Sequence, residues 1–374
     1  MRLETGILIL AAAWAAQSQT VPKLPIGMNI QTNCYYCQPI FLDAMKASGT
    51  WITFNAEGDS PWDTGLRDSL PADSNGYLLE LPFPVGSKPQ IVRSMLNDFY
   101  QGDYAVLHDG EGDLSIGGRT STRKDGILHV ELSGKGQNVW LNIHRSKKGN
   151  PVRNLRILPA AQVSAATVPT FHPGFLKGLG SMQALRLMDW MNINASSQKK
   201  WADKVKVSEY TQAGERGISI EYALELANLL KSDPWFSMPH QADDDYILRF
   251  SRLVKEKLHP SLKVYVEYSN EVWNWQFEQA HWIGKNAAGA DPAISAALRQ
   301  VGKTYCQDEA AYCHPEKDAH MMDRTFRLWR NVYSGADTAR MVRVAAVQHA
   351  WYGRPEKPMG IMGSPGRVRD PGQS

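Results

Sequence analysis

The chain has 374 residues, of which 43% are hydrophobic and 21% are charged, and its formal net charge is +3. This length accommodates two domains, and the composition is that of a globular protein with a core of normal size. The charge is nearly balanced and no run of Lys or Arg stands out, which argues against a nucleic acid or an anionic membrane as the main partner. The 12 Trp and 14 Tyr residues either fill the core or stack on sugar rings.

The amino-terminal segment, residues 1–20, is typical of a secretory signal peptide. Arg2 precedes an apolar run at residues 6–16 that contains small residues such as Ala13 and Ala15. The run is too short to span a bilayer, and no later segment is predicted to be transmembrane. We therefore expect a secreted or periplasmic protein.

The four cysteines form two local pairs, Cys34/Cys37 and Cys306/Cys313. In an exported protein either pair can form a short-loop disulfide. Zinc binding is disfavoured because the second pair lacks the CxxC spacing. We expect structural cysteines, free or disulfide-linked. No HExxH, GxSxG or P-loop motif occurs, so zinc protease, serine hydrolase and NTPase activities have no support. We expect neither a metal nor a cofactor.

Residues 21–57 are predicted to begin an α/β part of the chain. The pattern indicates a strand at 26–31, a short helix around 41–45 and a strand at 51–54. From residue 58 to residue 160 the sequence pattern is instead that of an all-β segment.

Short apolar segments separated by clusters of Gly, Asp, Ser and Asn are typical of antiparallel strands. They lie at 77–82, 102–107, 126–132, 138–143 and 155–158. This spacing predicts a β-sandwich of about 100 residues, inserted between early elements of the α/β part.

Residues 161–354 alternate strands with helices, which predicts a parallel sheet of about five strands. The later strands are expected at 184–188, 235–238, 263–268 and 342–347. The final segment, residues 355–374, is rich in Gly, Pro and Arg without periodicity, and we expect a disordered tail.

The most specific stretch is Val266-Glu-Tyr-Ser-Asn-Glu-Val-Trp-Asn274, at the end of a predicted parallel strand. Ligands of such folds bind at the carboxyl ends of the strands. A carboxyl group at Glu271, surrounded by Tyr268, Trp273 and Trp275, would be poorly solvated, which raises its pKa and suits a general acid. The alternative is that Glu271 caps the next helix or pairs with an arginine.

This stretch resembles the fourth-strand motif of clan A glycoside hydrolases, in which an Asn-Glu pair ends the strand. The resemblance implies a (β/α)8 TIM barrel, with Glu271 as the acid/base of a retaining mechanism and Asn270 contacting the sugar 2-hydroxyl. Val272 stands where many clan members have proline. The runs Leu185-Arg-Leu-Met-Asp-Trp190 and Met238-Pro-His240 also resemble bacterial proteins often labelled cellulose-binding.

Further candidates for substrate binding lie at the ends of other strands. Arg186 and Asp189 flank one strand end, where clan A enzymes often place an arginine beside the nucleophile; an ordinary ion pair is the alternative for Arg186. His240 binds a hydroxyl or is a structural histidine. Trp190, together with Trp273 and Trp275, is expected to hold a glycan.

The acidic run Asp243-Asp-Asp245 follows His240, which raises the question of a metal site. It stands at the start of a predicted helix, where acidic residues cap free amides and complement the helix dipole. Capping is the favoured interpretation.

A retaining glycosidase needs a second carboxylate about 5–5.5 Å from the first. In clan A that nucleophile ends strand seven, and this chain offers about five strands, so the resemblance implies a barrel that stops before completion. Asp189 and Glu267 are possible substitutes, and nothing in the sequence singles one out. We expect a glycoside hydrolase-like protein that cleaves or binds β-linked polysaccharide; the alternative is a non-catalytic secreted carbohydrate-binding protein.

Overall fold

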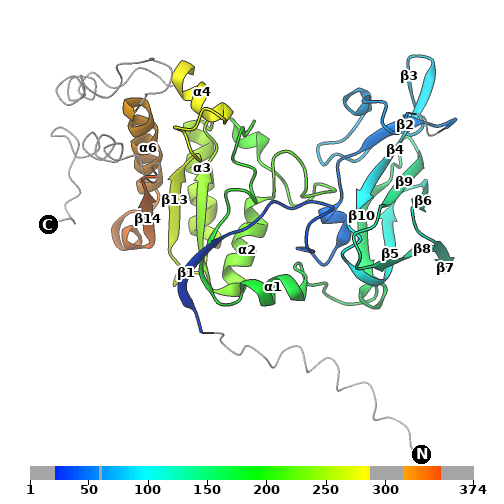
Figure 1. The fold of residues 1–374 in the computed structure, drawn as a ribbon, viewed down its shortest axis with the longest axis horizontal. Helices are drawn as coiled ribbons and strands as arrows, with labels where there is room; N and C mark the ends of the chain where they lie inside the picture. Colours follow the sequence, from blue (N-terminus) through cyan, green and yellow to red (C-terminus); the bar gives the residue numbers. More distant parts are fainter. Residues whose placement is uncertain (1–21, 59–60, 287–314, 347–374) are drawn as a thin grey trace, which may run out of the picture.

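The structure is a computed structural model, and it describes residues 22–58, 61–286 and 315–346. Figure 1 shows two parts side by side, one built on a parallel sheet with helices and the other on antiparallel strands. The predicted signal peptide, the predicted tail and the second cysteine pair lie outside the described residues.

The parallel sheet has the strand order β1-β11-β12-β13-β14. Its strands are β1 (Leu24–Asn29), β11 (Met182–Arg186), β12 (Asp233–Met238), β13 (Val264–Tyr268) and β14 (Met341–Val344). The prediction of a (β/α)8 TIM-barrel type is wrong, because this sheet is open and β1 pairs with β11 alone among the described strands. Alternating strands and helices specify parallel neighbours, but they do not specify that the sheet closes on itself.

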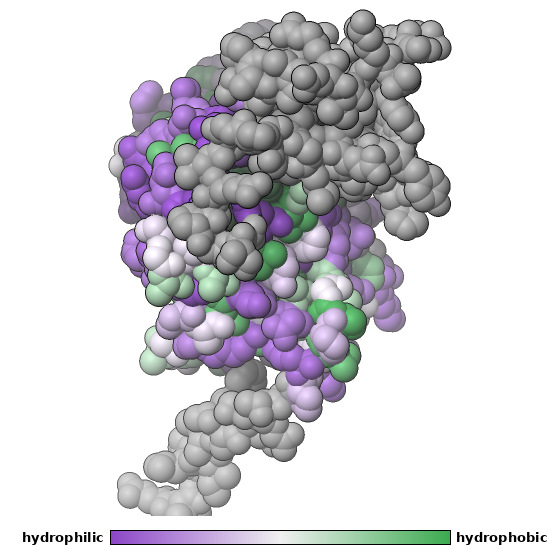
Figure 2. Space-filling view, turned by 90° about the vertical axis from the view of Figure 1, so that its left-hand side faces the viewer, coloured by the Kyte–Doolittle hydropathy of each residue, from purple (hydrophilic) through white to green (hydrophobic). Residues whose placement is uncertain are grey.

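Helices cover one face of the parallel sheet. They are α1 (Pro173–Leu179), α2 (Ile220–Leu230), α3 (Asp244–Lys257), α4 (Glu278–Asn286) and α6 (Pro315–Arg330). The apolar stripe of α3 is buried against the sheet, where the ring of Phe250 lies 5.0 Å from that of Phe236 in β12. On the side that carries α6 and β14, hydrophilic side chains make up most of the coloured surface, with hydrophobic ones scattered among them (Figure 2).

Two expectations about local structure can be checked directly. The carboxylate of Asp243 accepts a hydrogen bond of 2.8 Å from the backbone N–H of Tyr246, which confirms that the acidic run caps α3. Cys34 and Cys37 form a disulfide. Within the described ranges, no helix has the length and hydrophobicity to cross a bilayer, and no cluster of His, Cys, Asp or Glu is placed to hold a metal ion.

Between β1 and β11 the chain forms two antiparallel sheets that enclose a second core. The first has the order β10-β5-β8-β7, with β10 (Arg153–Pro159), β5 (Gln101–Asp109), β8 (Ile127–Ser133) and β7 (Ser121–Lys124). The second has the order β2-β4-β9-β6, with β2 (Ile52–Asn55), β4 (Lys88–Leu96), β9 (Val139–Ser146), β6 (Gly112–Gly117) and, beside β4, β3 (Phe83–Val85). Since β2 pairs with β4, the strand expected at 51–54 belongs to the antiparallel part. A four-residue apolar run does not reveal which sheet it joins.

The two parts are joined by specific contacts around the short helix η1 (Ala44–Ala47). The ring of Tyr210 stacks on Trp51 at 4.5 Å, and its hydroxyl accepts a 3.0 Å hydrogen bond from the Trp51 backbone. The Lys46 ammonium donates to the carbonyls of Val207 and Glu209 at 2.9 and 2.6 Å. A loop of the α/β part therefore completes the core of the antiparallel part.

Candidate functional site

The predicted site lies at the carboxyl edge of the parallel sheet, after β13. The strand ends at Tyr268, and the backbone then turns through Ser269 and Glu271, whose φ angles are 53° and 41°. Non-glycine residues rarely adopt this left-handed conformation, and it persists where the surrounding structure holds it in place. A strand that stayed regular up to Glu271 would place Glu267 and Glu271 on the same side, and this turn removes that relation.

Glu267 is the counter-charge of Arg186. The residue is 1% exposed, and its carboxylate accepts hydrogen bonds from Arg186 Nη2 and Nε at 2.9 and 3.2 Å. Trp235 Nε1 and the Ser237 hydroxyl donate to the same carboxylate at 2.8 and 3.0 Å. These hydrogen bonds and the ion pair with Arg186 compensate the buried negative charge of Glu267. Glu267 therefore holds Arg186 in place.

Asn270 is fixed from both ends of its side chain. Its Oδ1 accepts from Arg186 Nη2 at 2.9 Å, and its Nδ2 donates to Asn194 Oδ1 at 2.9 Å. Gln279 Nε2 donates to the same Asn194 oxygen at 2.8 Å and to the backbone carbonyl of Asn270 at 2.7 Å. Asn194 and Gln279 were not predicted from the sequence, because they come from a loop and a helix with no motif around them.

Glu271 follows this rigid residue and is half-buried. One carboxylate oxygen accepts a hydrogen bond of 2.8 Å from Asn274 Nδ2. The other oxygen accepts none from the residues that the structure describes. Glu271 therefore combines a fixed backbone with a carboxylate oxygen that is available to a ligand.

Asp189 is the other accessible carboxylate among the predicted residues. It is half-buried, and it accepts a 2.5 Å hydrogen bond from Asn29 Nδ2 at the end of β1. Its neighbour Trp190 is fully buried, and its ring lies 6.3 and 6.1 Å from those of Phe171 and Phe175. Trp190 packs in the core and offers no exposed face for a sugar.

His240 is also enclosed. Its ring is fully buried and lies 5.5 Å from that of Trp282, with Nε2 3.6 Å from a carboxylate oxygen of Glu278. Burial, together with a smaller contribution from the positive charge of Lys199, lowers the pKa of His240 to about 4. The imidazole is therefore neutral near pH 7 and has no exposed surface on which to receive a hydroxyl.

Trp273 and Trp275 are both half-buried. Trp273 packs against the core of the α/β part, and the ring of Trp275 lies edge-on to His281 at 4.1 Å. The structure thus brings Arg186 and Asn270 into one hydrogen-bonded network and places Glu271 next to it. Trp190 and His240 belong to the core behind that edge.

Comparison with known proteins gives no family for the chain. No family model, curated protein or solved structure matches it. The residues at the carboxyl edge therefore carry the functional assignment.

Proposed function

We propose that the protein acts on β-linked polysaccharide at the carboxyl edge of the parallel sheet, with Glu271 as the acid that protonates the glycosidic oxygen. The observation that supports this is the Asn270–Glu271 pair, in which a rigidly held amide precedes a half-buried carboxylate with one free oxygen. Amide and carboxylate groups match the donors and acceptors of sugar hydroxyls, and a general acid must be held in place relative to the leaving oxygen.

Asp189 is the second carboxylate of the proposed reaction. Glu267 is committed to Arg186, whereas Asp189 is half-buried and accepts a side-chain hydrogen bond from only one described residue, Asn29. In the retaining scheme, Glu271 gives its proton to the leaving oxygen as the glycosidic C–O bond breaks, and the Asp189 carboxylate bonds to the anomeric carbon. Water then releases the sugar while Glu271 takes back a proton.

The strand order favours a second candidate function, non-catalytic carbohydrate binding. Asp189 follows β11 and Glu271 follows β13, with β12 between them. Two strand spacings amount to about 10 Å, which is wider than the carboxylate separation of about 5–5.5 Å in retaining enzymes. In this second candidate, a ligand spans the two carboxylates at the wider separation and is bound without being cleaved.

Release of reducing sugar from β-glucan, xylan and mannan separates the two candidates. The proteins to compare are wild type, Glu271→Gln, Asp189→Asn and the control Glu256→Gln. Glu256 is an exposed residue near the carboxyl-terminal end of α3. Circular dichroism checks that each protein is folded. Turnover that Glu271→Gln and Asp189→Asn each reduce by at least about 100-fold supports hydrolysis. Binding of a polysaccharide without turnover supports the second candidate. If the wild type shows neither binding nor turnover, both candidates are contradicted.

A further inference from the structure

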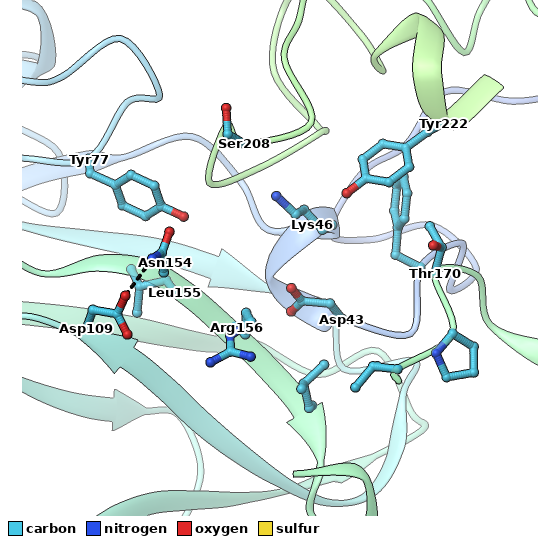
Figure 3. A pocket seen from close by; sticks show the side chains of 14 residues that line it. Asp43, Lys46, Tyr77, Asp109, Asn154, Leu155, Arg156, Thr170, Ser208 and Tyr222 are labelled. Atoms are coloured by element: carbon cyan, nitrogen blue, oxygen red, sulfur yellow. Dashed lines mark hydrogen bonds between the residues drawn. The ribbon is translucent and has the colours of Figure 1, made fainter. Parts of the chain in front are cut away.

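A cavity of about 560 Å³ lies where the antiparallel part meets the α/β part. Its walls come from segments far apart in the sequence: η1 and the residues before it, strands β5 and β10, the linker before α1, and α2. Figure 3 shows charged and hydroxyl-bearing side chains from several of these segments around one space. The cavity is separate from the carboxyl edge, since none of the edge residues lines it.

Asp43 presents a free acceptor to this cavity. Its Oδ1 accepts hydrogen bonds from the backbone N–H groups of Met45 and Ile157 at 3.0 and 2.8 Å. Its Oδ2 accepts none within the part of the chain that the structure describes. The carboxylate is thus held by one oxygen while the other is available.

Arg156 presents the complementary donor. It lines the cavity from β10, and its guanidinium makes neither a hydrogen bond nor a close ion pair with any described residue. Its positive charge acts on Asp43 through space. A free guanidinium near a free carboxylate oxygen binds adjacent hydroxyl groups, because the first donates and the second accepts.

Two tyrosines add hydroxyl groups from opposite sides. Figure 3 shows the hydroxyls of Tyr77 and Tyr222 directed toward the space between them. Burial raises the pKa of both to about 12, with the negative charge of Asp43 adding to the effect, so both remain neutral donors and acceptors. The hydroxyl of Tyr222 has no hydrogen-bond partner among the described residues.

The other two charged side chains of the cavity already have hydrogen-bond partners. Lys46 donates to two backbone carbonyls, and Asp109 accepts from Asn154 at 2.5 Å. Apolar groups complete the wall, contributed by Phe41, Leu155, Leu158, Val168 and Pro169. The two positive and two negative side chains of the lining cancel formally, and the cavity combines free hydrogen-bonding groups with apolar ones.

We infer that this cavity is a second ligand site, for a neutral sugar of one or two rings. A pyranose carries a ring of hydroxyl groups and an apolar face, which are the features that the polar groups of Asp43, Arg156 and Tyr222 and the apolar residues of the wall recognise. The volume lies within the usual range of small-molecule sites, about 300–1,000 Å³. The inference rests on the proposed function only for the choice of carbohydrate as the ligand class.

Isothermal titration with cellobiose, xylobiose and mannobiose tests this inference. We expect at least one of them to bind the wild type, with a Kd raised about tenfold by Arg156→Gln, which loses charge-assisted hydrogen bonds. Tyr222→Phe removes one neutral hydroxyl and should raise the Kd about three- to fivefold. The matched control Arg145→Gln changes an exposed arginine of β9 that does not line the cavity, and its Kd should equal that of the wild type.

Glu271→Gln distinguishes this site from the carboxyl edge. Disaccharide binding that Arg156→Gln weakens and Glu271→Gln leaves unchanged supports the cavity, whatever the polysaccharide assay shows. Binding that responds to Glu271→Gln alone places the sugar at the edge and overturns the inference. Absence of binding by all three disaccharides overturns it as well, and leaves the edge site to be judged by polysaccharide turnover.

Discussion

The carboxyl edge of the parallel sheet and the cavity at the junction both gather charged side chains, but they use them differently. At the edge, Glu267 and Arg186 bind each other and hold Asn270 in place. In the cavity, Asp43 and Arg156 keep hydrogen-bonding groups that no described residue occupies. A buried or clustered charge therefore does not by itself identify a ligand contact. Hydrogen-bonding atoms that have no partner among the described residues indicate a ligand site better.

The largest expected effect concerns the edge, where the buried ion pair is structural. Glu267→Gln removes the charge that compensates Arg186 and should destabilise the protein by about 3–5 kcal/mol. Urea unfolding measures the difference. Glu271→Gln, which alters a half-buried carboxylate at the same edge, is the matched control and should change the free energy of unfolding by less than about 1 kcal/mol. Equal losses in the two variants would mean that Glu267 has no special structural role.

His240 should make the protein less stable in acid. Its folded pKa is about 4, against 6.5 in the ordinary case, so the unfolded chain takes up a proton between pH 6.5 and 4 that the folded protein does not. The free energy of unfolding should fall by on the order of 3 kcal/mol as the pH falls through this window. His240→Leu should flatten this part of the curve. An unchanged slope would show that the imidazole is solvated.

Titration of Asp43 should change the free energy of unfolding in the opposite direction, so that its contribution favours the folded protein at low pH. Burial raises its pKa to about 6 from 3.8, so between pH 4 and 6 the folded protein keeps a proton that the unfolded chain releases. This contribution favours folding below pH 4 and is lost as the pH rises to 6, by on the order of 3 kcal/mol. Asp43→Asn keeps an oxygen for Met45 and Ile157, and it should gain stability relative to wild type at pH 7 and little at pH 4. A constant difference at both pH values would contradict the buried position of the carboxylate.

The smallest expected effect concerns the contact that joins the two parts. Tyr210→Phe removes the hydroxyl that accepts from the Trp51 backbone but keeps the stacked ring, and should cost about 1 kcal/mol. Thermal unfolding followed by near-ultraviolet circular dichroism reports on both rings. A loss of several kcal/mol would mean that the hydroxyl, rather than the stacked rings, holds the parts together.

Local features were the most predictable from the sequence. The strand expected at 263–268 corresponds to β13, and the cap at Asp243 begins α3 as predicted. Both depend on residues close together in the chain. The segment at 77–82 was predicted to be a strand, yet it forms only two isolated bridges, from Leu78 to Ala72 and from Leu81 to Ser146 at the end of β9. Because the two bridges go to different segments, they do not make a continuous ladder.

Long-range features were not predictable in the same way. Glu267 and Arg186 are separated by 81 positions, and no local pattern indicates that they form an ion pair. The sheet stays open although its strands and helices alternate, because closure depends on strand tilt and stagger. The cavity residues Asp43, Arg156 and Tyr222 come from three segments, so only the folded chain brings them together.

Affinity electrophoresis in gels containing soluble β-glucan, xylan or mannan tests most directly whether the carboxyl edge recognises polysaccharide. The wild type should be retarded by at least one polymer, and the double variant Asp189→Ala/Glu271→Ala should migrate closer to its position in a gel without polymer. The control Glu256→Gln should migrate as the wild type does. A wild type that no polymer retards, or a double variant retarded as strongly as the wild type, would contradict a polysaccharide site at this edge.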